Sequence, residues 1–214
     1  MDGFTGLDIV KAKSDLINFN TSTKNITSVY ADTVMNFFDD LAKKWGSPNA
    51  VIFCNDYVNR LRESVNNLST QLMHVVNGAV SAAQTIARSN GSTFSVDIEE
   101  VYAGKVAEEL SVMPVCSESV NGVTGMAVEN VKIIRDTFVT KTNEVITSLG
   151  NLPKGIAFYS TDGSLLNTYN TGIDTQVDGI KKEIDSVIKS LNSYIDTEAN
   201  NILLAKQQAN DMMA

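Results

Sequence analysis

The feature that most constrains this 214-residue chain is a set of long apolar seams at helical spacing. In the clearest seam an apolar residue recurs every three or four positions: Tyr57, Leu61, Val65, Leu68, Leu72, Val75, Ala79, Ala82 and Ile86. This spacing places the whole seam on one face of an α-helix. It predicts a helix from about Asn49 to Arg88, which is roughly 57 Å long and therefore needs packing partners along its whole length.

Three further seams have the same period. The first predicts a helix from about Leu7 to Lys44, with the seam Ile26, Tyr30, Val34, Phe37, Leu41 and Trp45. The next begins after Pro114 and comprises Val120, Val123, Ala127, Val131, Ile134, Phe138, Val145 and Leu149. The last runs almost to the C-terminus through Leu165, Tyr169, Ile173, Val177, Ile180, Ile184, Val187, Leu191, Ile195 and Ile202. The sequence thus predicts an all-α chain with four long helices.

The two halves of the chain share one pattern. When the first half of the sequence is moved along by 104 residues, the seam of the first helix falls on that of the third. Past the following turn, a shift of 112 residues is needed to place the second seam on the fourth. The difference predicts eight additional residues in the second turn. Each half then forms an antiparallel helical hairpin, over residues 1–91 and 115–214, and two hairpins face to face bury their apolar faces as a four-helix bundle, an intramolecular pseudo-dimer.

Part of this match would be shared by any two heptad-patterned hairpins, so a true duplication remains a hypothesis. The pattern also leaves open whether the hairpins pair within one chain or swap between two chains. Residues 92–114 form a connector of uncertain conformation. Thr93–Ile98 alternates like a short strand, whereas Glu99–Leu110 fits a short helix equally well.

Charge and apolar runs exclude several classes of function. A formal net charge of -8 argues against nucleic acid and anionic lipid as partners. No run approaches the roughly 20 apolar residues of a membrane-spanning helix, so we expect no stable membrane insertion. The N-terminal residues have neither the basic nor the apolar region of a Sec signal peptide.

Residues suited to catalysis are scarce. His74 is the only histidine and lies among apolar neighbours. Cys54 and Cys116 stand 62 positions apart without a CxxC pattern, so we expect two free thiols. The chain shows no metal-ligand cluster and no convincing pairing of a nucleophile with a base. We therefore expect a protein that is not an enzyme and that needs neither a metal nor a cofactor.

The joint between the first two helices carries the only tryptophan, in the run Trp45-Gly46-Ser47-Pro48. With two long helices on either side, this turn resembles that of the WXG-motif, ESAT-like helical proteins of bacterial type VII secretion. Those proteins are hairpins of about 100 residues that pair antiparallel into four-helix bundles. The resemblance covers both halves, hence the whole chain as a tandem. The motif reads Trp-Gly here rather than Trp-x-Gly, and Leu149-Gly150 stands at the corresponding place in the second half.

The resemblance also implies an export signal and a class of partner. The family signal, Tyr-x-x-x-Asp/Glu near the end of a helical hairpin, occurs here as Tyr194 and Glu198, which lie on one face of a helix. In the alternative interpretation Tyr194 is a flanking core residue and Glu198 a solvated charge. The implied partner is the type VII secretion ATPase, or a helical toxin or other partner protein that reads the folded bundle.

The resemblance implies a non-enzymatic secretion substrate, chaperone or structural partner, as a monomer or homodimer. It would be secreted without a Sec signal peptide, or reside in the bacterial cytoplasm before export. Two other classes remain. One is a component of an α-helical pore-forming toxin, against which the acidic, interrupted connector counts. The other is a generic helical adaptor with no link to secretion.

Overall fold

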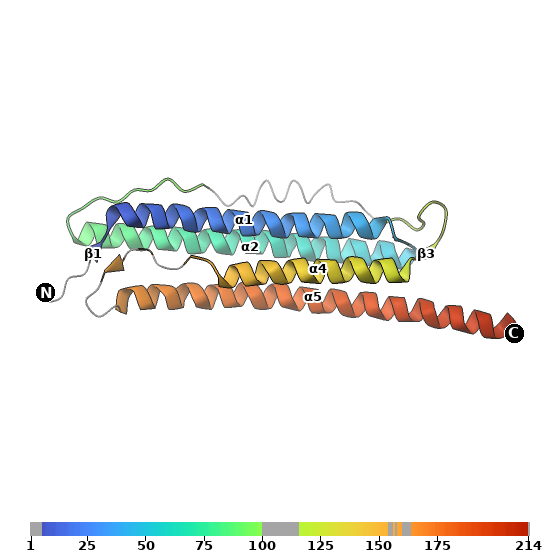
Figure 1. Ribbon diagram of the computed structural model, residues 1–214. Helices are drawn as coiled ribbons and strands as arrows, with labels where there is room; N and C mark the ends of the chain where they lie inside the picture. Colours follow the sequence, from blue (N-terminus) through green and yellow to red (C-terminus); the bar gives the residue numbers. More distant parts are fainter. Residues whose placement is uncertain (1–5, 100–115, 154–155, 157, 160–163, 214) are drawn as a thin grey trace.

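The computed structural model describes residues 6–99, 116–153, 156, 158–159 and 164–213. Within these residues the fold is all-α, with four long helices: α1 (Ile9–Ala42), α2 (Pro48–Ser89), α4 (Val128–Gly150) and α5 (Ser164–Met213). Helices α1 and α5 each pack against both α2 and α4. Figure 1 shows the four helices side by side along one long axis, with α5 continuing beyond the others at its C-terminal end. The expected four-helix bundle is confirmed.

A short turn joins the two helices of the first hairpin, and its residues account for the end of one helix and the start of the next. Helix α1 ends at Ala42, and Ser47 caps α2 by accepting a hydrogen bond from the backbone N–H of Ala50 at 3.0 Å. Pro48 occupies the first turn of α2, where its missing N–H costs no intrahelical bond. The observed ends of both helices lie within two residues of those predicted from the seams, as expected where turn residues follow a strong helical period.

The predicted start of the third helix is wrong. Val120 and Val123 form an isolated antiparallel bridge ahead of α4, which begins only at Val128. Between them Asn121 and Gly122 have φ values of 52° and 77°, a left-handed turn that a right-handed helix cannot contain. The two valines continue the apolar seam in sequence, but the chain turns back on itself instead.

Two pairs of very short strands tie each hairpin to the other. Strand β1 (Gly6–Leu7), ahead of α1, pairs antiparallel with β4 (Phe158–Tyr159), which lies between α4 and α5. Strand β2 (Trp45–Gly46), between α1 and α2, pairs antiparallel with β3 (Gly125–Met126), ahead of α4. In both cases the turn of one hairpin is bonded to the segment that leads into the other hairpin.

The loop between α4 and α5 is longer than the loop between α1 and α2, as the different shifts needed to align the two halves of the sequence predict. Five residues separate Ala42 from Pro48, and thirteen separate Gly150 from Ser164, a difference of eight. Helix α4 is the shortest of the four, at 23 residues against 34 for α1. Near the start of α1, the space that a longer α4 would fill is taken by the buried side chains of Ile156 and Phe158.

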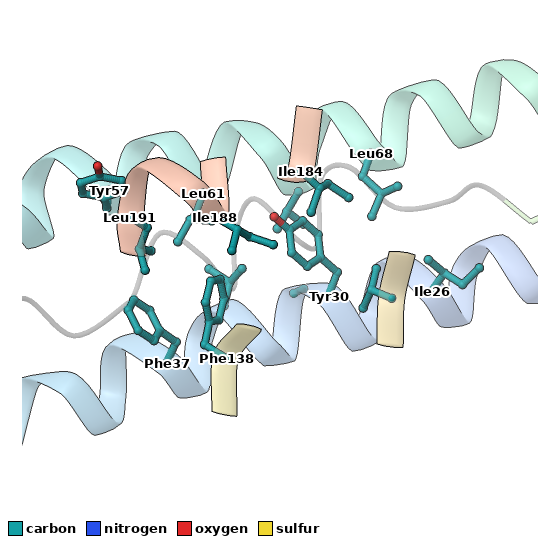
Figure 2. Packing of buried hydrophobic residues seen from close by; sticks show 14 of the residues in the cluster. Ile26, Tyr30, Phe37, Tyr57, Leu61, Leu68, Phe138, Ile184, Ile188 and Leu191 are labelled. Carbon is teal, nitrogen blue, oxygen red and sulfur yellow. The ribbon is translucent and has the colours of Figure 1, made fainter. Parts of the chain in front are cut away.

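All four helices contribute to the main apolar core. Figure 2 shows side chains converging between the helices, among them Tyr30 and Phe37 of α1, Leu61 of α2, Phe138 of α4 and Ile188 of α5. The rings of Phe37 and Phe138 lie 4.5 Å apart, so α1 and α4 meet through an aromatic contact. All of these except Ile188 belong to the predicted seams, whose burial drives association of the hairpins. The fourth seam included Val187, which is only partly buried, in place of its neighbour Ile188.

The described part of the connector, residues 92–99, lies against the first hairpin and contains no strand, although the alternation at residues 93–98 permitted one. Phe94 is buried beside Leu16 of α1 and Ala83 of α2. Asn20 of α1 forms two hydrogen bonds with the backbone of Glu99, donating at 2.9 Å and accepting at 3.0 Å. The short helix considered for Glu99–Leu110 lies almost wholly outside the described residues.

The expectation of two free thiols is also wrong. Cys54 of α2 and Cys116 form a disulfide with a Cα–Cα distance of 5.9 Å, and both residues are buried. The bond fixes the segment that follows the connector to α2. Spacing along the chain could not reveal this pairing, because the two cysteines stand 62 positions apart and meet only through the tertiary fold.

Candidate functional site

The Trp45-Gly46 turn is a buried structural joint. The Trp45 side chain is fully buried, its ring lies 5.3 Å from that of Phe53, and its indole N–H donates to the Ser47 hydroxyl at 3.0 Å. That same hydroxyl oxygen caps α2. Trp45 therefore fills the end of the bundle and holds the capping residue in place.

Gly46 is required by the close approach of another segment. Its backbone pairs with Gly125 in the β2–β3 ladder. A Cβ at position 46 would lie 2.5 Å from the carbonyl carbon of Ser119 and 2.6 Å from the backbone nitrogen of Val120. These backbone atoms leave no space for a side chain, so the segment that follows the disulfide packs directly on this glycine.

Leu149 and Gly150, the corresponding pair by sequence pattern, occupy a different structural position. They are the last two residues of α4, and Leu149 is buried. By strand pairing, the counterpart of Trp45 is Phe158. Phe158 pairs with Leu7 ahead of α1, as Trp45 pairs with Met126 ahead of α4. The aromatic residue at position 158 could have been used in the sequence to find the counterpart of Trp45. The longer second loop, however, moves it away from the position that the sequence pattern of the two halves aligns with Trp45.

Tyr194 and Glu198 lie on the face of α5 that meets α2. The Tyr194 ring is 5.2 Å from that of Phe53 and 6.1 Å from that of Tyr57. One helical turn further on, the Glu198 carboxylate accepts a hydrogen bond from the side-chain amide of Asn49 at 2.8 Å. Both residues remain partly exposed. The two residues singled out by the motif therefore form one patch at the seam between the two hairpins.

The structure brings the predicted turn and the predicted export signal together. Phe53 contacts Trp45 on one side and Tyr194 on the other, with ring centroids 5.3 Å and 5.2 Å apart. Asn49, which holds Glu198, lies in the first turn of the helix that Ser47 caps. Sequence analysis identified the two motifs separately and missed Asn49, Phe53 and Tyr57, because nothing in the sequence shows which residues of α2 face α5.

A shallow cleft opens at this patch. It has a volume of about 370 Å³ and is lined by Tyr57, Ser190, Ser193, Tyr194, Thr197 and Glu198; we call it the Tyr194 cleft. The Tyr57 hydroxyl is hydrogen bonded to that of Ser190 at 2.8 Å, which joins α2 to α5 at the cleft wall. The lining is thus aromatic and hydroxyl-bearing, with a carboxylate at one end.

The cleft favours a neutral phenol at Tyr194. Partial burial raises the pKa of this side chain, and the negative charges of Glu198 and Asp56 raise it further. The hydroxyl is therefore protonated at physiological pH and can both donate and accept a hydrogen bond. Such a group suits recognition of a partner, whereas a catalytic base or nucleophile would need a lowered pKa.

A second groove runs between α1 and α4. It has a volume of about 440 Å³, with Phe37 and Phe138 among its lining residues, together with the partly exposed Val29 and Ile133.

In the described residues no group of three or more His, Cys, Asp or Glu side chains is placed to hold a metal ion. No helix in that part of the chain is long and apolar enough to cross a membrane.

Comparisons with protein-family models, curated proteins and solved structures produced no match to this chain. The Tyr194 cleft is the place where most of the sequence-predicted features converge.

Proposed function

We propose that this protein is a non-enzymatic component of a bacterial type VII secretion system: a substrate, chaperone or structural partner that docks as a folded helical bundle. Its partner would be the secretion ATPase or a helical toxin or other partner protein. The residues that meet this partner are Tyr194 and Glu198, and the Trp45-Gly46 turn supports them from within the bundle.

The observation that carries the proposal is the convergence of these two motifs. They lie about 150 positions apart in the sequence, yet Phe53 bridges Trp45 and Tyr194 directly. A tyrosine and a carboxylate at i and i+4 occur often by chance. Their placement on the exposed seam between the hairpins, beside the only Trp-Gly turn, is a more specific arrangement than either motif alone.

The end of the molecule supports the same proposal. Beyond Glu198, α5 leaves the bundle and continues past the ends of the other helices (Figure 1). Nearly all residues from 201 to 213 are exposed, including Leu204 and Met212. A docking partner could approach the Tyr194 cleft and this projecting helix together, without unfolding the bundle.

The disulfide supports export as part of the proposed function. Structural disulfides persist in oxidising, extracytoplasmic environments and are rare in a reducing cytosol. Cys54 and Cys116 are both buried in the bonded form. A protein exported by a type VII route would be oxidised after it leaves the cytoplasm, which fits a bonded pair of cysteines.

The test is an immunoblot of cells and culture medium from strains with and without the type VII ATPase. We expect wild-type protein in the medium only when the ATPase is present. Retention in the cells of both strains would overturn the proposal and favour an intracellular adaptor. Appearance in both media would remove the link to this machine, and leakage of liposomes at low micromolar protein would then favour a pore-forming component.

A further inference from the structure

We infer that the Tyr194 cleft accepts an arginine side chain presented by the partner protein. This inference rests on the proposed docking function and names the chemistry of the docking group. It starts from the charge of Glu198. In the described part of the chain no lysine, arginine or histidine forms an ion pair with this carboxylate, and its only hydrogen-bond partner there is the neutral amide of Asn49. An incoming cation would therefore meet an unneutralised charge.

Carboxylates nearby are neutralised within the chain. Asp56 pairs with Arg60 at 3.1 Å, and Asp196 pairs with Arg135 across α4 and α5. Glu198 has no such cation among the described residues, on a chain whose formal net charge is -8. One helical turn before Glu198 on α5 stands Tyr194, whose ring lies 5.2 Å from that of Phe53.

The chain itself shows how a cation fits such a setting. The Arg60 guanidinium lies 5.1 Å from the centroid of the Tyr57 ring while it pairs with Asp56. A tyrosine face and a carboxylate thus bind one guanidinium on α2. Tyr194 and Glu198 repeat the ring and the carboxylate on α5, without a guanidinium of their own in the described residues.

The remaining groups of the cleft match the donors of arginine. Guanidinium carries five N–H donors in a plane and no acceptor. The cleft offers the carboxylate of Glu198, of which one oxygen already accepts from Asn49, and the hydroxyl oxygens of Ser193 and Tyr194. A guanidinium can lie flat on the Tyr194 ring and bond the carboxylate through two parallel N–H groups, whereas a lysine ammonium is a point charge with neither a plane nor a fork.

The test uses the full-length, disulfide-bonded protein and two small probes, Nα-acetyl-arginine amide and its uncharged isostere Nα-acetyl-citrulline amide. Binding is followed by two-dimensional amide NMR at low ionic strength. We expect saturable shifts around Tyr57, Tyr194 and Glu198 with the arginine probe, and affinity at least about tenfold weaker with the citrulline probe. Glu198→Gln should weaken arginine binding to a similar degree.

Glu183→Gln is the matched control. Glu183 lies on the same side of α5 and also accepts a hydrogen bond from an asparagine of α2, Asn67, at 2.8 Å. It does not line the cleft. This variant should bind the arginine probe as the wild type does. Equal shifts with both probes, shifts scattered over the acidic surface, or no saturable shift would each overturn the inference.

The readouts separate this inference from the proposed function. If export depends on the ATPase and on Glu198 while the arginine probe fails to bind, the arginine inference is wrong and the proposed function stands. If the probe binds as expected but export is independent of the ATPase, the cleft is an arginine site in a protein with a different role.

Discussion

At the residue scale, Gly46 shows how one position can be fixed by tertiary contact. A glycine between two helices is expected from turn chemistry alone, but here the space that a Cβ would need is occupied by backbone atoms of Ser119 and Val120. The sequence indicated a turn at this place. It could not indicate that a segment more than seventy positions later would pack on the glycine.

Gly46→Ala should destabilise the fold by about 2–3 kcal/mol, because backbone atoms within 2.6 Å must move to accommodate the methyl group. The measurement is the free energy of unfolding in urea. Gly78→Ala provides the control: Gly78 lies inside α2 with nothing within 4 Å of its Cβ position, so alanine should stabilise the protein by about 0.5–1 kcal/mol. Similar effects of the two substitutions would contradict the packing at Gly46.

Tyr30 gives a second prediction at this scale. Burial raises its pKa from 10.0 to about 12, and its hydroxyl bonds that of Ser64 at 3.0 Å. Since the folded-state pKa exceeds the unfolded one, the neutral phenol contributes stability that is complete below pH 10 and is lost as the pH rises toward 12. The loss should be of the order of 2–3 kcal/mol.

Unfolding measured from pH 8 to pH 12 tests this prediction. In wild type the free energy of unfolding should decline above pH 10, and Tyr30→Phe should remove a large part of that decline. The variant should also be less stable near neutral pH, because the Ser64 hydroxyl loses its partner. An unchanged alkaline decline in the variant would show that other tyrosines cause it.

At the element scale, the accuracy of the sequence-based prediction follows the strength of the local signals. The helices α1 and α2 lie close to their predicted ends, since capping and turn residues stand where the apolar period stops. The start of α4 was placed too early, because Val120 and Val123 keep the period while Asn121 and Gly122 take left-handed conformations. Apolar spacing alone does not report such a break.

The disulfide belongs to this scale too, as it fixes one segment to one helix. Replacing both cysteines, Cys54→Ser with Cys116→Ser, should lower the free energy of unfolding by about 3–4 kcal/mol for a bridge that spans 62 residues. Denaturation with and without reductant measures this change. The wild type should be sensitive to reductant and the double variant insensitive; reductant sensitivity in both would point to another origin.

At the scale of the whole molecule, the arrangement has an approximate twofold character. Each hairpin's turn carries a two-residue strand that pairs with the segment preceding the other hairpin. The loop difference of eight residues agrees with the shift between the sequence patterns. These features fit a duplicated hairpin, and they explain how two halves with different helix lengths remain in register.

The candidate site was predictable only in part. Helical geometry alone places Tyr194 and Glu198 on one face. Their partners Asn49, Phe53 and Tyr57 lie on a different helix, and which faces of α2 and α5 meet is decided by packing of the whole bundle. The proximity of the Trp45-Gly46 turn to Tyr194 is therefore a property of the fold, and the proposed secretion role depends on whether a partner binds there.

The most direct test of the docking account is the export of a variant altered only at the cleft. The double variant Tyr194→Phe with Glu198→Gln keeps the packed ring and removes the hydroxyl and the charge, and Glu183→Gln is its control. The ratio of protein in the medium to protein in the cells should fall about tenfold or more for the double variant, while its melting temperature and the export of the control stay near those of wild type. Undiminished export of a folded double variant would contradict the claim that the Tyr194 cleft is read by the secretion machine.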